Sequence, residues 1–108
     1  MKVINIAKDF SRYPSGRYRR DSPVSGQRFR DDFLRPALEA NKEVQVVLDG
    51  SKSFGSSFLE EAFGGLVRTG SLRSKDLGIR LFIVAESPIY ETYKVKIEKY
   101  INAAEEPN

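Results

Sequence analysis

The sequence predicts an α/β domain with a mixed, largely parallel sheet of three or four strands and three helices. Short apolar, β-branched runs at residues 2–7, 44–48 and 79–85 predict strands. Segments with helical spacing of apolar residues separate or follow these runs, and such alternation favours parallel pairing through right-handed crossovers. The length of 108 residues fits one domain. We therefore expect a single domain over residues 1–104, followed by a frayed tail at 105–108.

The first strand is followed by a segment rich in Pro, Gly and Ser, which indicates turns. Residues 17–19 could form a brief strand antiparallel to the first one, after a turn at Pro14–Gly16. The sequence does not decide whether the loop at 10–24 is ordered by itself. A helix is expected next over 26–40, with Ser25 as its cap and a kink at Pro36.

The runs at 44–48 and 79–85 are almost continuously apolar, which is typical of strands covered on both faces or central in a sheet. A second helix is expected over 58–69, ended by Gly70. Its Gly64-Gly65 pair predicts a close approach of the helix backbone to the sheet. The third helix begins with Ser87 as cap and Pro88 at its first position, and its apolar stripe consists of Ile89, Tyr93, Ile97, Tyr100 and Ile101.

The chain has no cysteine and no histidine. This excludes disulfides, thiolate nucleophiles, Ser-His-Asp triads and the ordinary zinc sites. We therefore expect a protein that is not an enzyme and that has no metal or cofactor. No apolar run is long enough to span a membrane and the start does not resemble a secretory signal, so the expected location is the cytoplasm.

Positive charge is concentrated between Lys8 and Arg35, a segment that contains eight basic and four acidic residues. Arginines interleaved with aromatic side chains suit single-stranded nucleic acids, so a nucleic-acid-binding domain is an alternative function. The net charge of +3 is modest for that role. The basic patch of this hypothesis consists of Arg12, Arg17, Arg19, Arg20, Arg28 and Arg30.

The segment joining the middle strand to the second helix carries the main functional signal. In open α/β sheets, ligands bind near the carboxyl ends of the strands. Ser57 and Glu60 match a capping box, which leaves the hydroxyl of Ser56 outside the helix and free for another role. A second alternative is an enzyme that uses Asp49 and Glu86 with a divalent ion at the same rim.

The run at residues 55–68, together with 25–30 and 34–38, resembles a bacterial STAS-like family of unknown function. That family is similar to STAS domains, the fold of anti-sigma factor antagonists, which bind a histidine-kinase-type ATP-binding protein and are switched by serine phosphorylation. Asp49 and Ser51 match the motif's Asp-x-Ser, whereas Gly55 replaces its aspartate, Phe58 its glycine, and the usual last strand and helix are absent.

The resemblance implies a protein-binding regulatory module and an anti-sigma-type ATP-binding kinase as its partner. It implies Ser56 as the phosphorylated residue, with Ser57 as the second choice. A phosphoserine carries about −1.5 to −2 charges and would lie near Glu60 and Glu61, so we expect phosphorylation to weaken partner binding. The residues expected to contact the partner are Asp49, Ser51, Ser56, Ser57, Glu60 and Glu61.

Overall fold

A computed structural model describes residues 1–107 of the chain and shows a three-stranded parallel sheet. The strands β1 (Lys2–Asn5), β2 (Val44–Val47) and β3 (Leu81–Val84) lie in the order β1-β2-β3. Lys2 pairs with Val44, and Val44 pairs with Leu81. The predicted α/β class is confirmed, and the sheet is entirely parallel within the described residues.

The predicted strand at 17–19 is wrong. The N–H of Gly26 donates to the carbonyl of Gly16 at 2.9 Å, and that of Gln27 to the carbonyl of Arg17 at 3.0 Å. These carbonyls accept bonds from the first turn of a helix and are not available for a sheet. The loop is instead an ordered strap, and Gly16 takes a positive φ of 86° in it.

The first predicted helix is confirmed as a continuous run of α1 (Gly26–Phe29), the π-helical turn η2 (Arg30–Leu34) and α2 (Arg35–Ala40). Ser25 caps it, because its side chain accepts from the N–H of Arg28 at 3.2 Å. Pro36 is the second residue of α2, separated by one residue from the end of the π-helical turn. A widened turn changes the bonding pattern at the position where proline cannot donate, so the helix continues through Pro36.

The second helix consists of α3 (Ser56–Leu59), the π-helical turn η3 (Glu60–Gly64) and α4 (Gly65–Arg68). It begins two residues before the predicted start. Its predicted end is confirmed, because Gly70 has a φ of 81° and donates to the carbonyl of Val67 at 3.0 Å.

Two boundaries near the strands differ from the prediction. Strand β1 ends at Asn5, whose side chain accepts from the N–H of Lys8 and opens the π-helical turn η1 (Ile6–Phe10). Residues 79 and 80 belong to a short helix, α5 (Ser74–Arg80), that the sequence analysis missed. Arg80 donates to the carbonyls of Asn41 at 2.8 Å and Lys42 at 2.9 Å, and so satisfies acceptors just after α2.

The last helix begins with a 3-10 turn, η4 (Pro88–Tyr90), and continues as α6 (Glu91–Ala103). Ser87 precedes the turn but makes no capping bond with its side chain. Ile89 was expected in the apolar stripe, yet it is 72% exposed, and its neighbour Tyr90 is buried instead. The tight turn at Pro88 rotates the first residues relative to the helix that follows.

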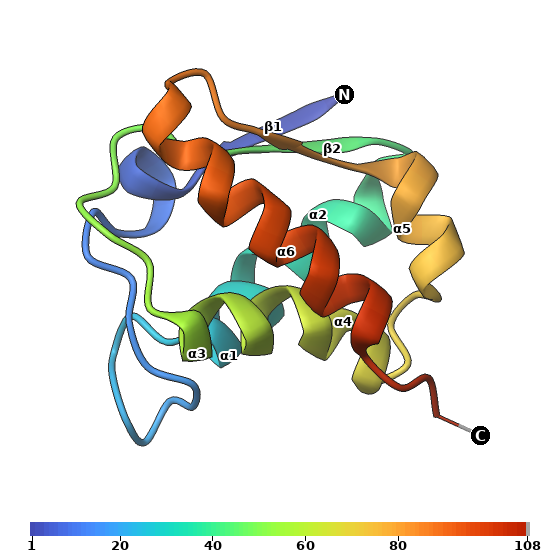
Figure 1. The fold of residues 1–108 in the computed structure, drawn as a ribbon. Coiled ribbons are helices and arrows are strands. Elements are labelled where there is room, and N and C mark those ends of the chain that lie inside the picture. Colours follow the sequence, from blue (N-terminus) through green and yellow to red (C-terminus); the bar gives the residue numbers. More distant parts are fainter. Residues whose placement is uncertain (108) are drawn as a thin grey trace.

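All the long helices lie on one face of the sheet (Figure 1). A sequential strand order with crossovers of one hand places the connecting helices on one side. Of the two alternatives for the apolar strands, coverage on both faces is therefore wrong, whereas a central position holds for β2. Ile4, Val46 and Ile83 are buried in the core, whereas Val3 is 50% and Phe82 38% exposed. The core contains an aromatic cluster of Phe10, Phe29, Phe33, Phe54, Phe58 and Phe63.

The chain leaves α6 at Ala103, and Pro107 lies against Gly70 after the second helix. The predicted frayed tail includes Asn108, which lies outside the described residues. Among residues 1–107, no helix is long and apolar enough to cross a membrane.

Candidate functional site: a serine rim supported by a buried ion-pair network

The segment after β2 is fixed to the start of the last helix by Asp49. Its carboxylate accepts from the N–H of Glu86 at 2.7 Å and of Ser87 at 2.8 Å. Burial raises the pKa of Asp49, but these hydrogen bonds outweigh it and hold the pKa below its ordinary value. Asp49 therefore joins the ends of β2 and β3, and each of its two carboxylate oxygens accepts a hydrogen bond from the backbone.

The next residues are anchored by Tyr90. Its hydroxyl accepts from the N–H of Gly50 at 3.2 Å and donates to the carbonyl of Ser51 at 2.6 Å. Ser51 is only 3% exposed, and its hydroxyl has no hydrogen-bond partner within the described chain. Ser51 was expected to contact a partner, and its burial corrects that prediction.

The segment is held again at Lys52 and Phe54. The N–H of Lys52 donates to the carbonyl of Arg12 at 2.8 Å, and Phe54 packs edge-on against Tyr93 with ring centroids 5.1 Å apart. Five residues within 52–57 are exposed, including Lys52, whose backbone is anchored. We call them the serine rim: Lys52, Ser53, Gly55, Ser56 and Ser57.

The capping argument for Ser56 is wrong, although its conclusion about exposure holds. Gly55 is the N-cap, with no side-chain bond, and Ser56 is the first residue of the helix. The first backbone bond of this helix runs from the N–H of Leu59 to the carbonyl of Gly55. The amides of Ser56 and Ser57 therefore belong to the free first turn of a helix, which attracts negative charge.

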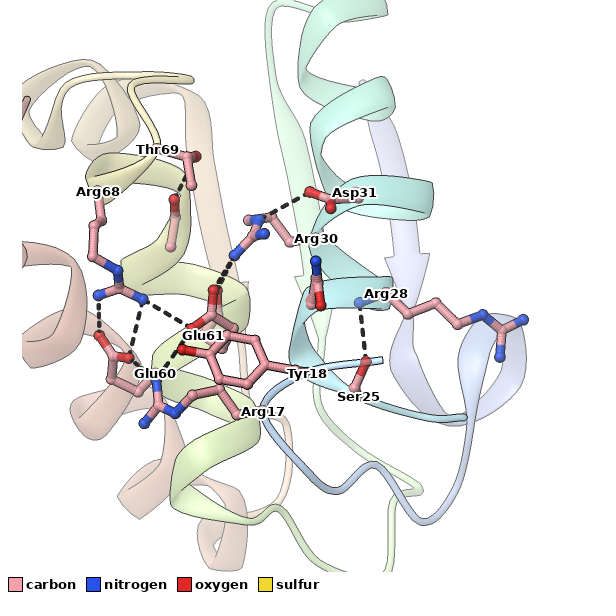
Figure 2. A network of polar contacts seen from close by, with 12 residues as sticks. Arg17, Tyr18, Ser25, Arg28, Arg30, Asp31, Glu60, Glu61, Arg68 and Thr69 are labelled. Carbon is pink, nitrogen blue, oxygen red and sulfur yellow. Dashed lines mark hydrogen bonds and ion pairs between the residues drawn. The ribbon is translucent and has the colours of Figure 1, made fainter. Parts of the chain in front are cut away.

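Glu60 and Glu61 do not extend this rim, because both are engaged by arginines (Figure 2). Glu60 pairs with Arg17 and, at 2.7 Å, with Arg68. Burial raises the pKa of Glu60, but the hydrogen bonds from Arg68 and Arg17 lower it by a larger amount. The pKa of Glu60 therefore lies below its ordinary value. Glu61 is 5% exposed and pairs with the buried Arg30.

Both members of the buried pair lie in π-helical turns of neighbouring helices. Arg30 also donates to the main-chain carbonyl of Glu61 at 3.1 Å and to the carboxylate of Asp31 at 2.9 Å. Gly65 provides the space, since a Cβ there would collide with the Arg30 guanidinium. Gly65 therefore allows close packing against Arg30, while Gly64 lies against Glu60 and the main chain of Tyr100, so neither glycine approaches the sheet as predicted.

The predicted basic patch is mostly paired inside the molecule. Arg17 binds Glu60 and Glu61, Arg19 binds Asp32 at 2.7 Å, and Arg30 is buried. Arg28 lies over the ring of Phe10 and 3.9 Å from Asp32. Arg12 and Arg20 are the patch members with no ion pair among residues 1–107, which leaves little free positive charge for a nucleic acid.

The geometry also does not support the alternative of an enzyme that uses Asp49 and Glu86 with a divalent ion. Asp49 is occupied by backbone amides, and Glu86 contributes its N–H to this contact, while its side chain is exposed. In the described part of the chain, no group of three or more acidic side chains is placed to hold a metal ion.

Sequence reasoning missed Tyr90, Arg68 and the Arg30–Glu61 pair. A tyrosine directly after Ile89 was a weak signal, because one residue of rotation decides which of the two is buried. The two adjacent glutamates, Glu60 and Glu61, were assigned to the partner contact. Gly65, one turn after Glu61, was the signal that a large side chain approaches this face.

The sheet, the helices on one face and the exposed serines at the start of the second helix define an α/β domain of STAS-like architecture. A family model described as a STAS-like domain of unknown function matches residues 25–90, more than half of the chain. The protein belongs to this STAS-like family. Comparison with curated proteins and with solved structures gave no match.

Proposed function

We propose that the protein is a non-catalytic, protein-binding regulatory module and that the serine rim is its recognition surface. The observation that carries the proposal is the combination of exposure and anchoring. Ser53, Ser56 and Ser57 are exposed on a segment that Asp49, Tyr90 and Phe54 hold in place. A surface that is already ordered loses little conformational entropy when a partner binds.

The strand order also favours a macromolecular partner. Strand order β1-β2-β3 has no reversal, so it does not create the crevice in which open α/β sheets bind small ligands. Four grooves of the described chain are lined by residues outside the serine rim. By resemblance to STAS domains, we propose a histidine-kinase-type ATP-binding protein as the partner.

The same resemblance leads us to propose phosphorylation of Ser56 as the switch. A phosphate there would lie at the first turn of a helix, where the free amides of Ser56 and Ser57 favour it. Glu60 and Glu61 repel it less than the sequence suggested, because arginines neutralise both. Phosphorylation therefore leaves the fold intact and changes the charge of the rim, which weakens partner binding.

Photo-crosslinking in the native cell tests this proposal. A photoreactive amino acid replaces Ser53 in one variant and Lys75, an exposed residue of α5, in a control variant. We expect a protein adduct at Ser53 that is absent at Lys75 and that contains an ATP-binding kinase-type protein. Equal adducts at both positions contradict the rim as the recognition surface.

Substitutions of Ser56 then test the switch. Ser56→Ala removes the phosphate acceptor and should keep the Ser53 adduct. Ser56→Glu adds a charge at the helix start and should reduce the adduct at least about tenfold, the equivalent of 1.4 kcal/mol in binding. If Ser56→Glu forms the adduct as well as the unchanged protein does, Ser56 is not the switch.

A further inference from the structure

Strand β3 has an unpaired edge. It pairs with β2, and no other strand follows it within residues 1–107. The carbonyl of Val84 accepts from the N–H of Leu48 at 3.0 Å, so Val84 faces β2. Because the direction alternates along a strand, the N–H and C=O of Ile83 point away from β2. The edge therefore offers free main-chain groups for another strand.

This edge carries few of the features that usually prevent strand addition. Native edges are protected by very short strands, charged residues, proline or bulges. Strand β3 is short, with four residues, but Leu81–Val84 contains no charged residue and no proline, whereas the opposite edge strand, β1, begins with Lys2.

A groove of about 300 Å³ borders the same strand, between α5, β3 and α6. Leu81 and Ile83 form its wall on the strand side, and Ile101 lies opposite on α6. In Figure 1, β3 is the orange stretch of chain that joins α5 to the last helix, and it forms one edge of the sheet. A strand added along β3 would place alternate side chains in this groove, as in other cases of strand addition.

Gly78 keeps the groove open without a structural reason of its own. It lies inside helix α5, where glycine costs about 1 kcal/mol relative to alanine. Its φ is not positive, and a Cβ at this position would meet nothing within 4 Å. Gly65 is needed for the packing of Arg30, whereas no neighbouring atom requires glycine at position 78. The missing side chain leaves room in the groove for a bound segment.

Charge defines part of the occupant. Glu98 of α6 is the ionisable residue that lines the groove, and it is exposed. Its other lining residues are apolar, glycine, serine or asparagine. A cationic side chain next to an aliphatic one therefore complements the groove.

We propose that β3 and this groove bind an extended peptide segment of a partner protein as a fourth strand. The segment pairs with the main chain of Ile83. One aliphatic side chain packs against Leu81 and Ile101, and a lysine or arginine two residues away pairs with Glu98. This surface is distinct from the serine rim and does not depend on the function proposed for it.

The test uses the full chain and a short acetylated peptide in which threonines alternate with leucine and lysine. Binding is followed by NMR chemical shifts. We expect saturable shifts at the amides of Leu81 to Val84 and of Gly78. A peptide of the same sequence with N-methylated threonines should bind at least about tenfold more weakly, because it loses main-chain hydrogen bonds.

Two variants connect the shifts to the groove. Gly78→Leu fills it and should weaken binding at least about tenfold, while Gly78→Ala confirms by its unchanged or raised melting temperature that α5 tolerates a side chain. Glu98→Lys should weaken binding of the lysine peptide and improve binding of a matching glutamate peptide. Glu98 is exposed, so this exchange does not disturb the core.

Each other outcome overturns the proposal. No shifts at β3 at millimolar peptide, or shifts confined to other elements, exclude this groove as a peptide site. Equal binding by Gly78→Leu excludes the groove even if the edge is used. If the protein alone forms a dimer that Gly78→Leu dissociates, the occupant is a second copy of the chain and not a partner peptide.

Discussion

At the scale of single residues, we expect the largest loss of stability when one member of the buried Arg30–Glu61 pair is removed. Their side chains are 6% and 7% exposed, so each charge has lost most of its water. Such a pair contributes little net stability, but removal of one partner leaves the other charge buried and uncompensated. Glu61 forms further ion pairs with Arg17 at 3.2 Å and Arg68 at 3.1 Å. Arg30 forms one further ion pair within the described residues, with Asp31.

We therefore predict that Glu61→Gln destabilises the protein by about 3–5 kcal/mol. Glu60→Gln is the matched control: Glu60 is half-buried, and its pairs with Arg17 and Arg68 resemble surface pairs, so the expected loss is about 1 kcal/mol or less. Urea unfolding at neutral pH measures both. Equal losses for the two variants would contradict the special role of the buried pair.

The sequence analysis did not predict this buried pair, although Gly65 was a signal for it. Arg30 was assigned to a basic surface and Glu61 to a partner contact, because charged residues are almost always exposed. Burial of both depends on Gly65, which leaves room for a guanidinium between two helices. Exposure of Ser56 was predicted from a capping argument that is wrong. The structure shows Ser56 as the exposed first residue of the helix, after Gly55 as the N-cap.

At the scale of elements, the segment at residues 11–24 acts as a strap across the two long helices. The N–H of Gly26 donates to Gly16, and the side chain of Arg17 reaches Glu60 and Glu61 of the second helix. Its charges therefore stabilise helix packing. This is why a segment that looked like a nucleic-acid-binding patch leaves few arginines free.

We predict that Arg17→Ala loosens the strap without unfolding the core. Hydrogen exchange of the amides of Gly26 and Gln27, which bond to the strap, should speed up at least several-fold, while exchange in β2 stays unchanged. Arg19→Ala is the control, since its pair with Asp32 is nearly half exposed. Faster exchange throughout β2 would show that Arg17 supports the whole fold instead.

Elements with strong periodicity were predicted well, and short ones were not. The helix over 26–40 was placed correctly because its apolar rows and Ser25 cap agree. Helix α5 was missed because it has seven residues, and its last two continue into the apolar run of β3. A single buried residue, Leu77, gives no period to detect.

At the scale of the whole molecule, the sequence predicted parallel strands but not their cover. Continuous apolar strands usually indicate helices on both faces. Here the strand order places every long helix on one face and leaves Val3 and Phe82 partly exposed on the other. Composition reports how apolar a strand is, whereas strand order decides which face its helices cover.

Three carboxylates distributed over the molecule connect stability to pH. Asp32 is held by Arg19, which outweighs its desolvation; for Asp49 and Glu60 desolvation raises the pKa but hydrogen bonds lower it more. All three pKa values are thus lower in the folded state than in the unfolded chain. The unfolded state binds more protons in this range, so stability is full above about pH 4.5 and falls as the pH drops through the folded values.

We predict a steady fall of the urea midpoint as the pH drops below about 4.5. Asp49→Asn should start from a lower midpoint at neutral pH, because an amide oxygen replaces the charged acceptor of Glu86 and Ser87. It should then fall less steeply with acid than the unchanged protein, since one of the three groups no longer takes up a proton. A midpoint that is constant or rises on acidification contradicts the lowered pKa values, and the same slope in Asp49→Asn removes Asp49 from this set.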